Sequence, residues 1–329
     1  MTASLSPPAE VLALAEQRDA ARQARDFQAA DDLREQITAA GWRAVDTAGG
    51  TQLEPLPPFT LFERITDLPE PQSLRQSTTC GVGLIVDGWP EDLSACVTDL
   101  LTHAPADVVI HLLDCGNVDG AGLVAQQLAD AHADRIDVVH LSGTLDQVGW
   151  GAACTALIML EDAPCHVVMD MSSRLTGDAI SPLIATINHS SDFAGESGNL
   201  EPRGAVVAAG WRGVDVNLAD QWRTFDPAGP GEVDALLGYF LLIRTDVAQR
   251  IPPSAKAKFY RNADMEWSLA IREAGGCLVA IDLPIEQARH HGYYDSDPQF
   301  RDREAKRTYD RLLQRFRGRN DLLHPRAGA

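Results

Sequence analysis

The sequence predicts an α/β protein with a mixed, mostly parallel sheet, preceded by a helical hairpin. From Cys80 onward, short apolar runs alternate with segments of helical periodicity, as in parallel sheets covered on both faces. Residues 9–40, in contrast, place apolar side chains only at helical spacing. We therefore expect a helical hairpin with a small β-hairpin at 1–55, a linker at 56–79 and the α/β domain at 80–325.

The front segment contains two predicted helices, the second ending at Gly41, which is a plausible C-terminal stop. The sequence WRAVDTAGGTQLEP follows, and its Gly49-Gly50 pair favours a tight turn between two short strands. Residues 56–79 are rich in proline and polar side chains, which indicates a linker or a wrapping segment.

The predicted domain opens with four buried strands, VGLIV, DVVIHLLD, IDVVHLS and HVVMD. The segments between them, PEDLSACVTDLLTHA, GAGLVAQQLADAHA and GWGAACTALIML, have helical character. The pattern then becomes less regular. GAVVAAGWRGVDV predicts strands with a bend, VDALLGYFLLIRTDV a strand entering a helix, and RNADMEWSLAIREAGG a helix with Asp264 in its first turn.

Three aspartates, Asp87, Asp114 and Asp170, each close a predicted strand. Because ligands bind such sheets at the carboxyl ends of the strands, these side chains are candidates for one site. Asp170 has a second interpretation. The residues after it include Ser172 and Ser173, and such a sequence also favours a turn that the carboxylate caps.

The net charge of −19 argues against a nucleic-acid-binding protein, because phosphate contacts require clustered lysine and arginine. Residues 299–326 differ, with nine basic against four acidic side chains. That predicted C-terminal helix could make peripheral contact with an anionic membrane surface or with phosphates, or it could be a solvated amphipathic helix.

The six cysteines are scattered without a C-x-x-C pair, which predicts buried, reduced thiols. The longest apolar run, residues 235–243, is far shorter than the ~20 residues that span a bilayer. No charged-then-apolar segment opens the chain. We therefore expect a cytoplasmic protein.

Several segments, in order, resemble the inverting family-2 glycosyltransferases, which have the GT-A fold, from about Cys80 to Leu323. VGLIVDGWPEDLSACVTDLL looks like that family's first strand and helix, and VIHLLDCGNVDG like its second strand. GTLDQVGWGAACTAL is similar to its N-x-G-x-A-x-A-R-N segment, and VVMDMSS lies where the family has its D-x-D. FYRNADMEWSLAIREAGG is similar to its E-D helix, and LPIEQARHHGYYD to a late histidine segment.

The resemblance implies a hexosyltransferase-type enzyme that binds a nucleotide-diphosphate sugar. It implies that Asp87, Asp114 and Asp170 bind this donor, with Asp114 at the base and Asp170 at the ribose and the metal ion. The ion would be Mn²⁺ or Mg²⁺, and His290 or His291 would serve as an auxiliary ligand. Ordinary loop histidines are the alternative for that pair. The acceptor could be a glycan, a lipid or a protein.

The resemblance also places Asp264 at the position of the general base, which takes the acceptor's proton during inverting transfer. A carboxylate at a helix N-terminus would be kept ionised by the helix dipole. The alternative is that Asp264 is only a helix-start acid, since acidic residues favour that end of a helix.

The sequence departs from the family pattern at several places, among them Ser172, Ala263 and the pair Cys154-Thr155. Ser172 stands at the second acid of the D-x-D, where a hydroxyl is a weaker ligand for a hard cation than a carboxylate. An aspartate at position 172 would then be expected to tighten metal-dependent binding. These departures also favour an alternative function, a catalytically inactive GT-A protein that acts in binding or as a scaffold.

Residues 16–55 have their own resemblance, to the C-terminal tail of cysteinyl-tRNA synthetases, which is a helical hairpin followed by D-T-x-x-G-T. Residues 9–46 carry eight acids against five arginines, which disfavours phosphate binding. We interpret the segment as a packing or protein-interaction module and expect no nucleic-acid partner.

Overall fold

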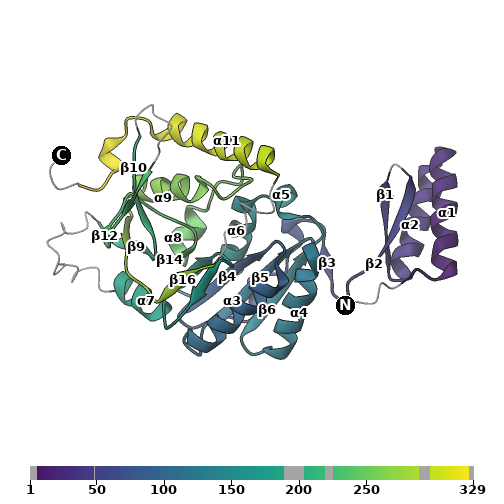
Figure 1. Ribbon diagram of the computed structural model, residues 1–329, viewed down its shortest axis with the longest axis horizontal. Coiled ribbons are helices and arrows are strands. Elements are labelled where there is room, and N and C mark those ends of the chain that lie inside the picture. The colour runs from purple at the N-terminus through teal and green to yellow at the C-terminus, as the bar shows by residue number, and fades with distance from the viewer. Residues whose placement is uncertain (1–5, 48, 189–203, 219–224, 289–296, 326–329) are drawn as a thin grey trace. The chain divides into compact units, whose positions relative to one another are not determined.

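The computed structural model describes residues 6–47, 49–188, 204–218, 225–288 and 297–325 of the 329-residue chain (Figure 1). Contacts divide the chain into two compact units, Met1–Thr60 and Leu61–Ala329. Each unit has its own hydrophobic core.

The first unit is the predicted helical hairpin with its β-hairpin. Its elements are α1 (Ala9–Gln23), α2 (Phe27–Ala39) and the antiparallel pair β1 (Trp42–Thr47) and β2 (Gly50–Pro55). Buried Arg18 of α1 donates to Asp46 and to the Thr51 hydroxyl, at 2.7 Å each. Asp19 accepts the Thr51 hydroxyl at 2.6 Å. Polar contacts thus join the helices to the hairpin within the unit.

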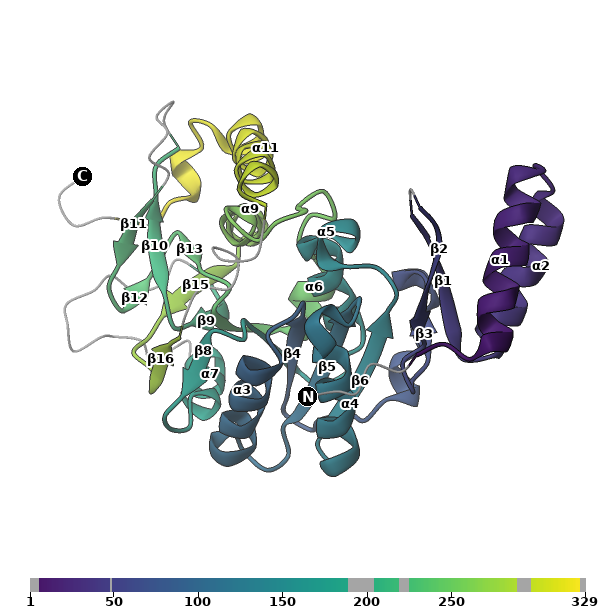
Figure 2. The same ribbon diagram turned by 45° about the vertical axis from the view of Figure 1, so that its right-hand side comes forward.

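The second unit is built on a nine-stranded sheet (Figure 2). In spatial order its strands are β12 (Gly231–Glu232), β15 (Cys277–Ala280), β9 (Val206–Gly210), β14 (Phe240–Arg244), β7 (Cys165–Met169), β4 (Cys80–Val86), β5 (Val109–Cys115), β6 (Ile136–Leu141) and β3 (Leu61–Phe62). The run from β7 to β3 is parallel, whereas β14 pairs antiparallel with both β7 and β9. The predicted mixed, mostly parallel sheet is confirmed.

The segment expected to be a linker contributes to this unit. Leu61 and Phe62 add the edge strand β3, and two 3-10 turns follow, η1 (Ile65–Asp67) and η2 (Pro71–Ser73). Apolar side chains of the segment pack against a buried cluster on the sheet: Phe62, Ile65, Leu68 and Leu74. Burial of these side chains, which the proline content does not reveal, holds residues 61–79 to the α/β unit.

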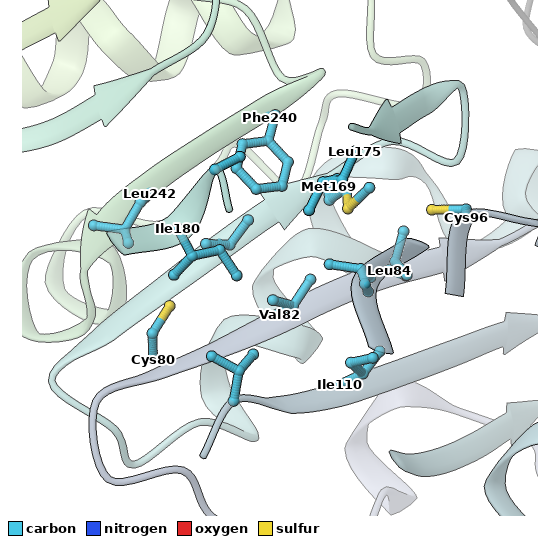
Figure 3. Packing of buried hydrophobic residues seen from close by; sticks show 14 of the residues in the cluster. Cys80, Val82, Leu84, Cys96, Ile110, Met169, Leu175, Ile180, Phe240 and Leu242 are labelled. Atoms are coloured by element: carbon cyan, nitrogen blue, oxygen red, sulfur yellow. The ribbon is translucent and has the colours of Figure 1, made fainter. Parts of the chain in front are cut away.

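Alternating strand residues face two layers of helices. One face packs against α3 (Pro90–His103), α4 (Ala121–Ala131) and α7 (Ile180–Asn188). Figure 3 shows this face, with Val82 and Leu84 of β4 on one side of β7 and Phe240 and Leu242 of β14 on the other. The other face packs against α5 (Leu145–Val148), α6 (Trp150–Met159), α8 (Thr245–Arg250) and α9 (Ala263–Glu273). Each fully buried leucine or phenylalanine contributes roughly 1.5–3 kcal/mol to folding.

The remaining elements form two small sheets and a C-terminal helix. They are β11 (Phe225–Ala228) beside β10 (Gly213–Val216) and β13 (Ala235–Leu236), β8 (Ser173–Leu175) beside β16 (Ile285–Gln287), and the turn η3 (Val118–Gly120). The chain then forms α11 (Pro298–Phe316) and η4 (Asn320–Leu322), which pack on α9 and β10.

A buried polar cluster lies on the α6 face of the sheet. His111, Glu161 and His166 are each at most 1% exposed, and His111 Nε2 lies 3.5 Å from Glu161 Oε2. Gly81 and Gly83 of β4 make room for them, since a Cβ at Gly81 would stand 1.3 Å from Glu161 Oε2. Burial lowers the pKa of His166 to about 4, so this imidazole is neutral at pH 7.

All six cysteines are free and buried, as predicted. None of the described helices combines the length and the apolar character that crossing a bilayer requires.

Candidate functional site

The candidate site lies at the carboxyl ends of the neighbouring strands β7, β4 and β5. A cavity of about 540 Å³ opens there, within the usual size range of ligand pockets. Part of its apolar wall comes from one face of the sheet, with Ile85 of β4 and Val168 of β7, and from one face of α6, with Trp150, Cys154 and Leu157. Every second side chain of a strand and every third or fourth side chain of a helix point the same way, so the sheet and α6 can both direct side chains into one cavity.

Charged side chains also line this cavity, among further apolar ones. The acidic ones are Asp87, Asp119, Asp146, Asp170 and Asp297, and the basic ones are Lys258 and Arg303. Asp87 and Asp170, two of the three predicted strand-end aspartates, are therefore brought to the same cavity.

Asp170 follows β7 directly, caps the turn after the strand and lines a cavity. Its Oδ1 accepts the backbone N–H of Ser172 at 2.8 Å, and its own N–H donates to the Tyr239 carbonyl at 3.0 Å. The carboxylate thus closes the turn after the strand. It also lines the large cavity and a second, smaller one.

Ser172 does not lie on the wall of either cavity. Its side chain is 1% exposed, and its hydroxyl makes no hydrogen bond to any described residue. The position that resembles the second acid of a D-x-D therefore lies in the protein interior, because the backbone turns into β8 at Ser173.

We expect Ser172→Asp to weaken the protein without creating a metal site, which differs from the expectation based on the sequence. A carboxylate buried there without a partner is strongly unfavourable, so the variant should melt at a lower temperature. Thermal unfolding and Mn²⁺ titration of wild type and variant measure both effects. Tighter Mn²⁺ binding with an unchanged melting temperature would contradict this placement.

Asp264 stands in the first turn of α9, as predicted, and is buried. Its Oδ2 accepts the Gly238 N–H at 3.1 Å, and its Oδ1 accepts the Met265 N–H at 2.9 Å. Burial raises its pKa to about 6 despite these hydrogen bonds. Burial therefore outweighs the backbone hydrogen bonds, and the carboxyl is still largely ionised at pH 7.

A cavity of about 120 Å³ joins Asp264 to Asp170. Three aromatic residues contribute to its wall: Trp150, Tyr239 and Tyr260. Trp150, Asp170, Gly238 and Tyr260 line both cavities, so the two spaces adjoin. No sequence pattern pointed to Tyr239 and Tyr260, which loops bring to the site.

Asp114 is not on the wall of either cavity. It is fully buried, its Oδ2 lies 2.9 Å from His140 Nδ1, and its Oδ1 accepts the Asn117 N–H at 3.1 Å. Gly122 passes so close that a Cβ there would lie 2.2 Å from Asp114 Oδ2. In this structure Asp114 holds the loop after β5, whereas the resemblance implied contact with a nucleotide base.

His290 and His291 lie outside the described residues. Another group could hold a cation, Asp215, Asp234 and His324, whose ligand atoms all lie within 4.8 Å of one another. Asp234 is fully buried and already accepts His324 Nδ1 at 3.0 Å and the Val216 N–H at 2.9 Å. These three residues are far apart in the sequence and form no motif. The packing of the C-terminal segment on β10 brings them together.

The basic C-terminal helix carries less unpaired charge than its composition suggests. Arg311 forms two hydrogen bonds with Glu266 of α9, at 3.1 and 2.8 Å, and Arg315 pairs with Glu273 at 2.6 Å. Further pairs within the helix are Arg301–Asp302, Arg303–Glu304, Lys306–Asp310 and Arg307–Glu304. Membrane contact through this helix stays a prediction.

No protein-family model matches the chain. Over 188 residues, 56% of the chain, the sequence is 28% identical to polyprenol monophosphomannose synthase of Mycolicibacterium smegmatis, and the match covers 68% of that protein. A stretch of 48 residues, 15% of the chain, is 60% identical to cysteine–tRNA ligase of Opitutus terrae, of which it spans only 10%.

Among solved structures, the fold is similar to that of GalNAc-T7 crystallised with UDP, GalNAc and Mn²⁺. The TM-score is 0.51 at 12% identity, and the match covers 71% of this chain and 48% of that one. The chain therefore spans about half the length of this neighbour. The likeness confirms the predicted fold class, GT-A.

Proposed function

We propose that the protein is a glycosyltransferase that moves a sugar from a nucleoside-diphosphate donor to an acceptor, with inversion at the anomeric carbon. The observation that carries the proposal is the pair of adjoining cavities. The volume of the larger is within the range of ligand pockets, the smaller is lined by the buried carboxyl of Asp264, and Asp170 lies on the wall of both.

In the proposed reaction, Asp264 accepts the proton of a hydroxyl group or of a phosphate monoanion on the acceptor, as the acceptor oxygen bonds to the anomeric carbon. The bond from that carbon to the diphosphate oxygen breaks, and the diphosphate leaves with the electron pair. A carboxyl with a pKa of about 6 is suited to this role, because it is largely ionised at pH 7 yet more basic than an exposed aspartate.

A divalent cation fits the donor set of the larger cavity, where carboxylates of Asp87 and Asp170 offer the oxygen ligands that Mn²⁺ and Mg²⁺ prefer. We propose Asp170 as the main protein ligand. When bound, the ion would neutralise charge on the leaving diphosphate. Ser172 is too buried to be a second ligand, so ion binding should depend strongly on the diphosphate itself.

The related proteins suggest which substrates to test first. The mycobacterial relative is named for mannose and a polyprenol phosphate, and the structural neighbour was crystallised with UDP and GalNAc. GDP- and UDP-linked sugars are therefore the first donors, and a polyprenol phosphate is the first acceptor.

We expect GDP or UDP to stabilise the wild-type protein, and Mn²⁺ to increase that effect. At a ligand concentration 100 times the Kd, the gain is about 2.7 kcal/mol. Asp170→Asn should remove the Mn²⁺-dependent part, because the carboxylate is the proposed ion ligand. Thermal shift and calorimetry with each diphosphate, with and without Mn²⁺, measure this.

The matched control is Asp162→Asn, an exposed acid that lines neither cavity. A wild-type protein that binds neither diphosphate would contradict the proposal. If the protein binds a diphosphate but transfers no sugar and hydrolyses no donor, the alternative of a catalytically inactive binding protein would replace it. The interior position of Ser172 is the observation that favours this alternative.

A further inference from the structure

The larger cavity has a charge imbalance that a diphosphate must overcome. Its described wall carries five aspartates against one lysine and one arginine. Arg303 is bonded to Glu304 at 3.1 Å, which neutralises part of its charge. The position that resembles the family's arginine is Cys154, a neutral side chain on the same wall.

Lys258 is the other cationic side chain on the wall, and backbone groups of residues 147–149 hold it in place. Its ammonium donates to the carbonyl oxygens of Gln147 and Val148, at 2.8 and 3.0 Å, at the C-terminal end of α5. The stem crosses Gly149, where a Cβ would lie 2.8 Å from Lys258 Cδ. Gly149 also has φ +96°, a conformation that strongly favours glycine.

Two further features hold the loop that carries this lysine. Gly151 donates its N–H to the Ala257 carbonyl at 2.9 Å, and a Cβ at Gly151 would stand 2.0 Å from the Ser254 carbonyl oxygen. The loop therefore packs backbone to backbone against the start of α6, which fixes Lys258 in position.

The hydrogen bonds of Lys258 leave one donor for a ligand. An ammonium has three N–H groups, and carbonyls accept two of them. Within the described part of the chain, Lys258 forms no ion pair with a carboxylate, so its positive charge is not neutralised. The side chain lines the cavity next to the loop of Trp150.

We propose that Lys258 is the fixed cation that binds the diphosphate of the donor in this cavity. The inference rests on the proposed function. Because the lysine is already held by two carbonyls, little side-chain freedom is lost when an anion binds. Its charge also remains when no metal ion is bound, which gives the diphosphate a partner independent of the carboxylates.

We expect Lys258→Met to weaken binding of GDP or UDP by about 10- to 100-fold, the usual effect of losing a charge-assisted hydrogen bond. Binding of the corresponding nucleoside, guanosine or uridine, should be unchanged. The remaining diphosphate binding should depend more steeply on Mn²⁺. Calorimetry with nucleoside and diphosphate, with and without Mn²⁺, separates these effects in the full-length chain.

The matched control is Lys256→Met, which removes an exposed lysine two residues away that does not line the cavity. If Lys258→Met fails to fold, Lys258→Gln retains an N–H donor for the carbonyls without the charge and should show the same selective loss. Equal loss of nucleoside and diphosphate, or an unchanged diphosphate Kd, would overturn the inference. A wild type that binds no diphosphate would instead overturn the proposed function.

Discussion

Replacing Asp264 with asparagine should abolish sugar transfer and, at neutral pH, make the protein more stable. The catalytic loss follows from removing the proposed base, whose contribution is typically about 10²–10⁴-fold. The gain in stability follows from burial, which raises the folded-state pKa of Asp264 to about 6, whereas the group has an ordinary value of 3.8. An asparagine carries no buried charge and can still accept the Gly238 N–H. Its amide NH₂ would face the Met265 N–H, so that hydrogen bond is lost at every pH, at a cost of about 1 kcal/mol that is smaller than the gain at neutral pH.

The sign of the pH dependence is fixed by that shift. Well below pH 4 the carboxyl is protonated in both the folded and the unfolded state, so the substitution should cost no more than the lost Met265 hydrogen bond. Between about pH 4 and 6 the carboxyl ionises in the unfolded state but stays protonated in the folded state, so wild type should lose roughly 2–3 kcal/mol relative to the variant, and above that range the difference should stay constant. Urea unfolding at pH 4, 5, 6 and 7.5 measures this difference, with Asp162→Asn as the control.

The ionisation of His166 changes the stability of the protein in the opposite direction over a similar pH range. Its folded-state pKa of about 4 is below the ordinary value of 6.5, so its contribution to stability is lost as the pH falls from 6.5 toward 4. In wild type the pH dependences of stability that arise from Asp264 and from His166 partly cancel. Asp264→Asn should therefore show a steeper loss of stability in acid, and a pH-independent gain would contradict the assignment. Transfer by wild type should rise as the pH passes 6.

Replacing Gly81 with alanine should destabilise the protein severely, by about 3 kcal/mol or more. The new Cβ would lie 1.3 Å from Glu161 Oε2, so that carboxylate must move. Glu161 is fully buried beside His111, with its other oxygen bonded to the Ala163 N–H at 2.7 Å. Overpacking in a core usually costs 1–3 kcal/mol, and displacing a buried carboxylate adds to that cost.

A double-mutant cycle with Glu161→Ala tests this account. If the clash with Glu161 is the cause, Gly81→Ala should cost much less when the longer side chain is absent. Gly229→Ala is the control, because a Cβ there has no neighbour within 4 Å. Thermal and urea unfolding of the four variants provide the comparison. Strictly additive effects would show that the collision is not what constrains Gly81.

The predictive power of the sequence was greatest where local patterns report directly on burial. The alternation of apolar runs and helical segments after Cys80 predicted a parallel sheet with two helical layers, because each strand and helix must cover its apolar residues. The same logic placed Asp87 and Asp170 at one sheet edge and Asp264 at the start of α9.

The sequence could not determine which of these side chains reach the cavity. Asp114 closes β5 as predicted, yet Asn117, Gly122 and His140 enclose it, and Ser172 turns into the interior. A one-dimensional pattern gives the position of a residue along a strand, but the loops that follow decide its exposure. Proline content left open whether residues 56–79 are a linker or a wrapping segment, and the packing of apolar side chains of residues 61–79 on the sheet favours the second.

Short-range periodicity therefore determined the α/β architecture and the edge of the sheet at which Asp87 and Asp170 lie, and the resemblance to a known family added the GT-A fold. Only the tertiary structure decided the chemistry of that edge. It raised the pKa of Asp264 to about 6 by burial and laid Lys258 across Gly149. It also brought Asp215, Asp234 and His324 together. These effects depend on contacts between residues distant in the sequence, and packing, not local propensity, sets them.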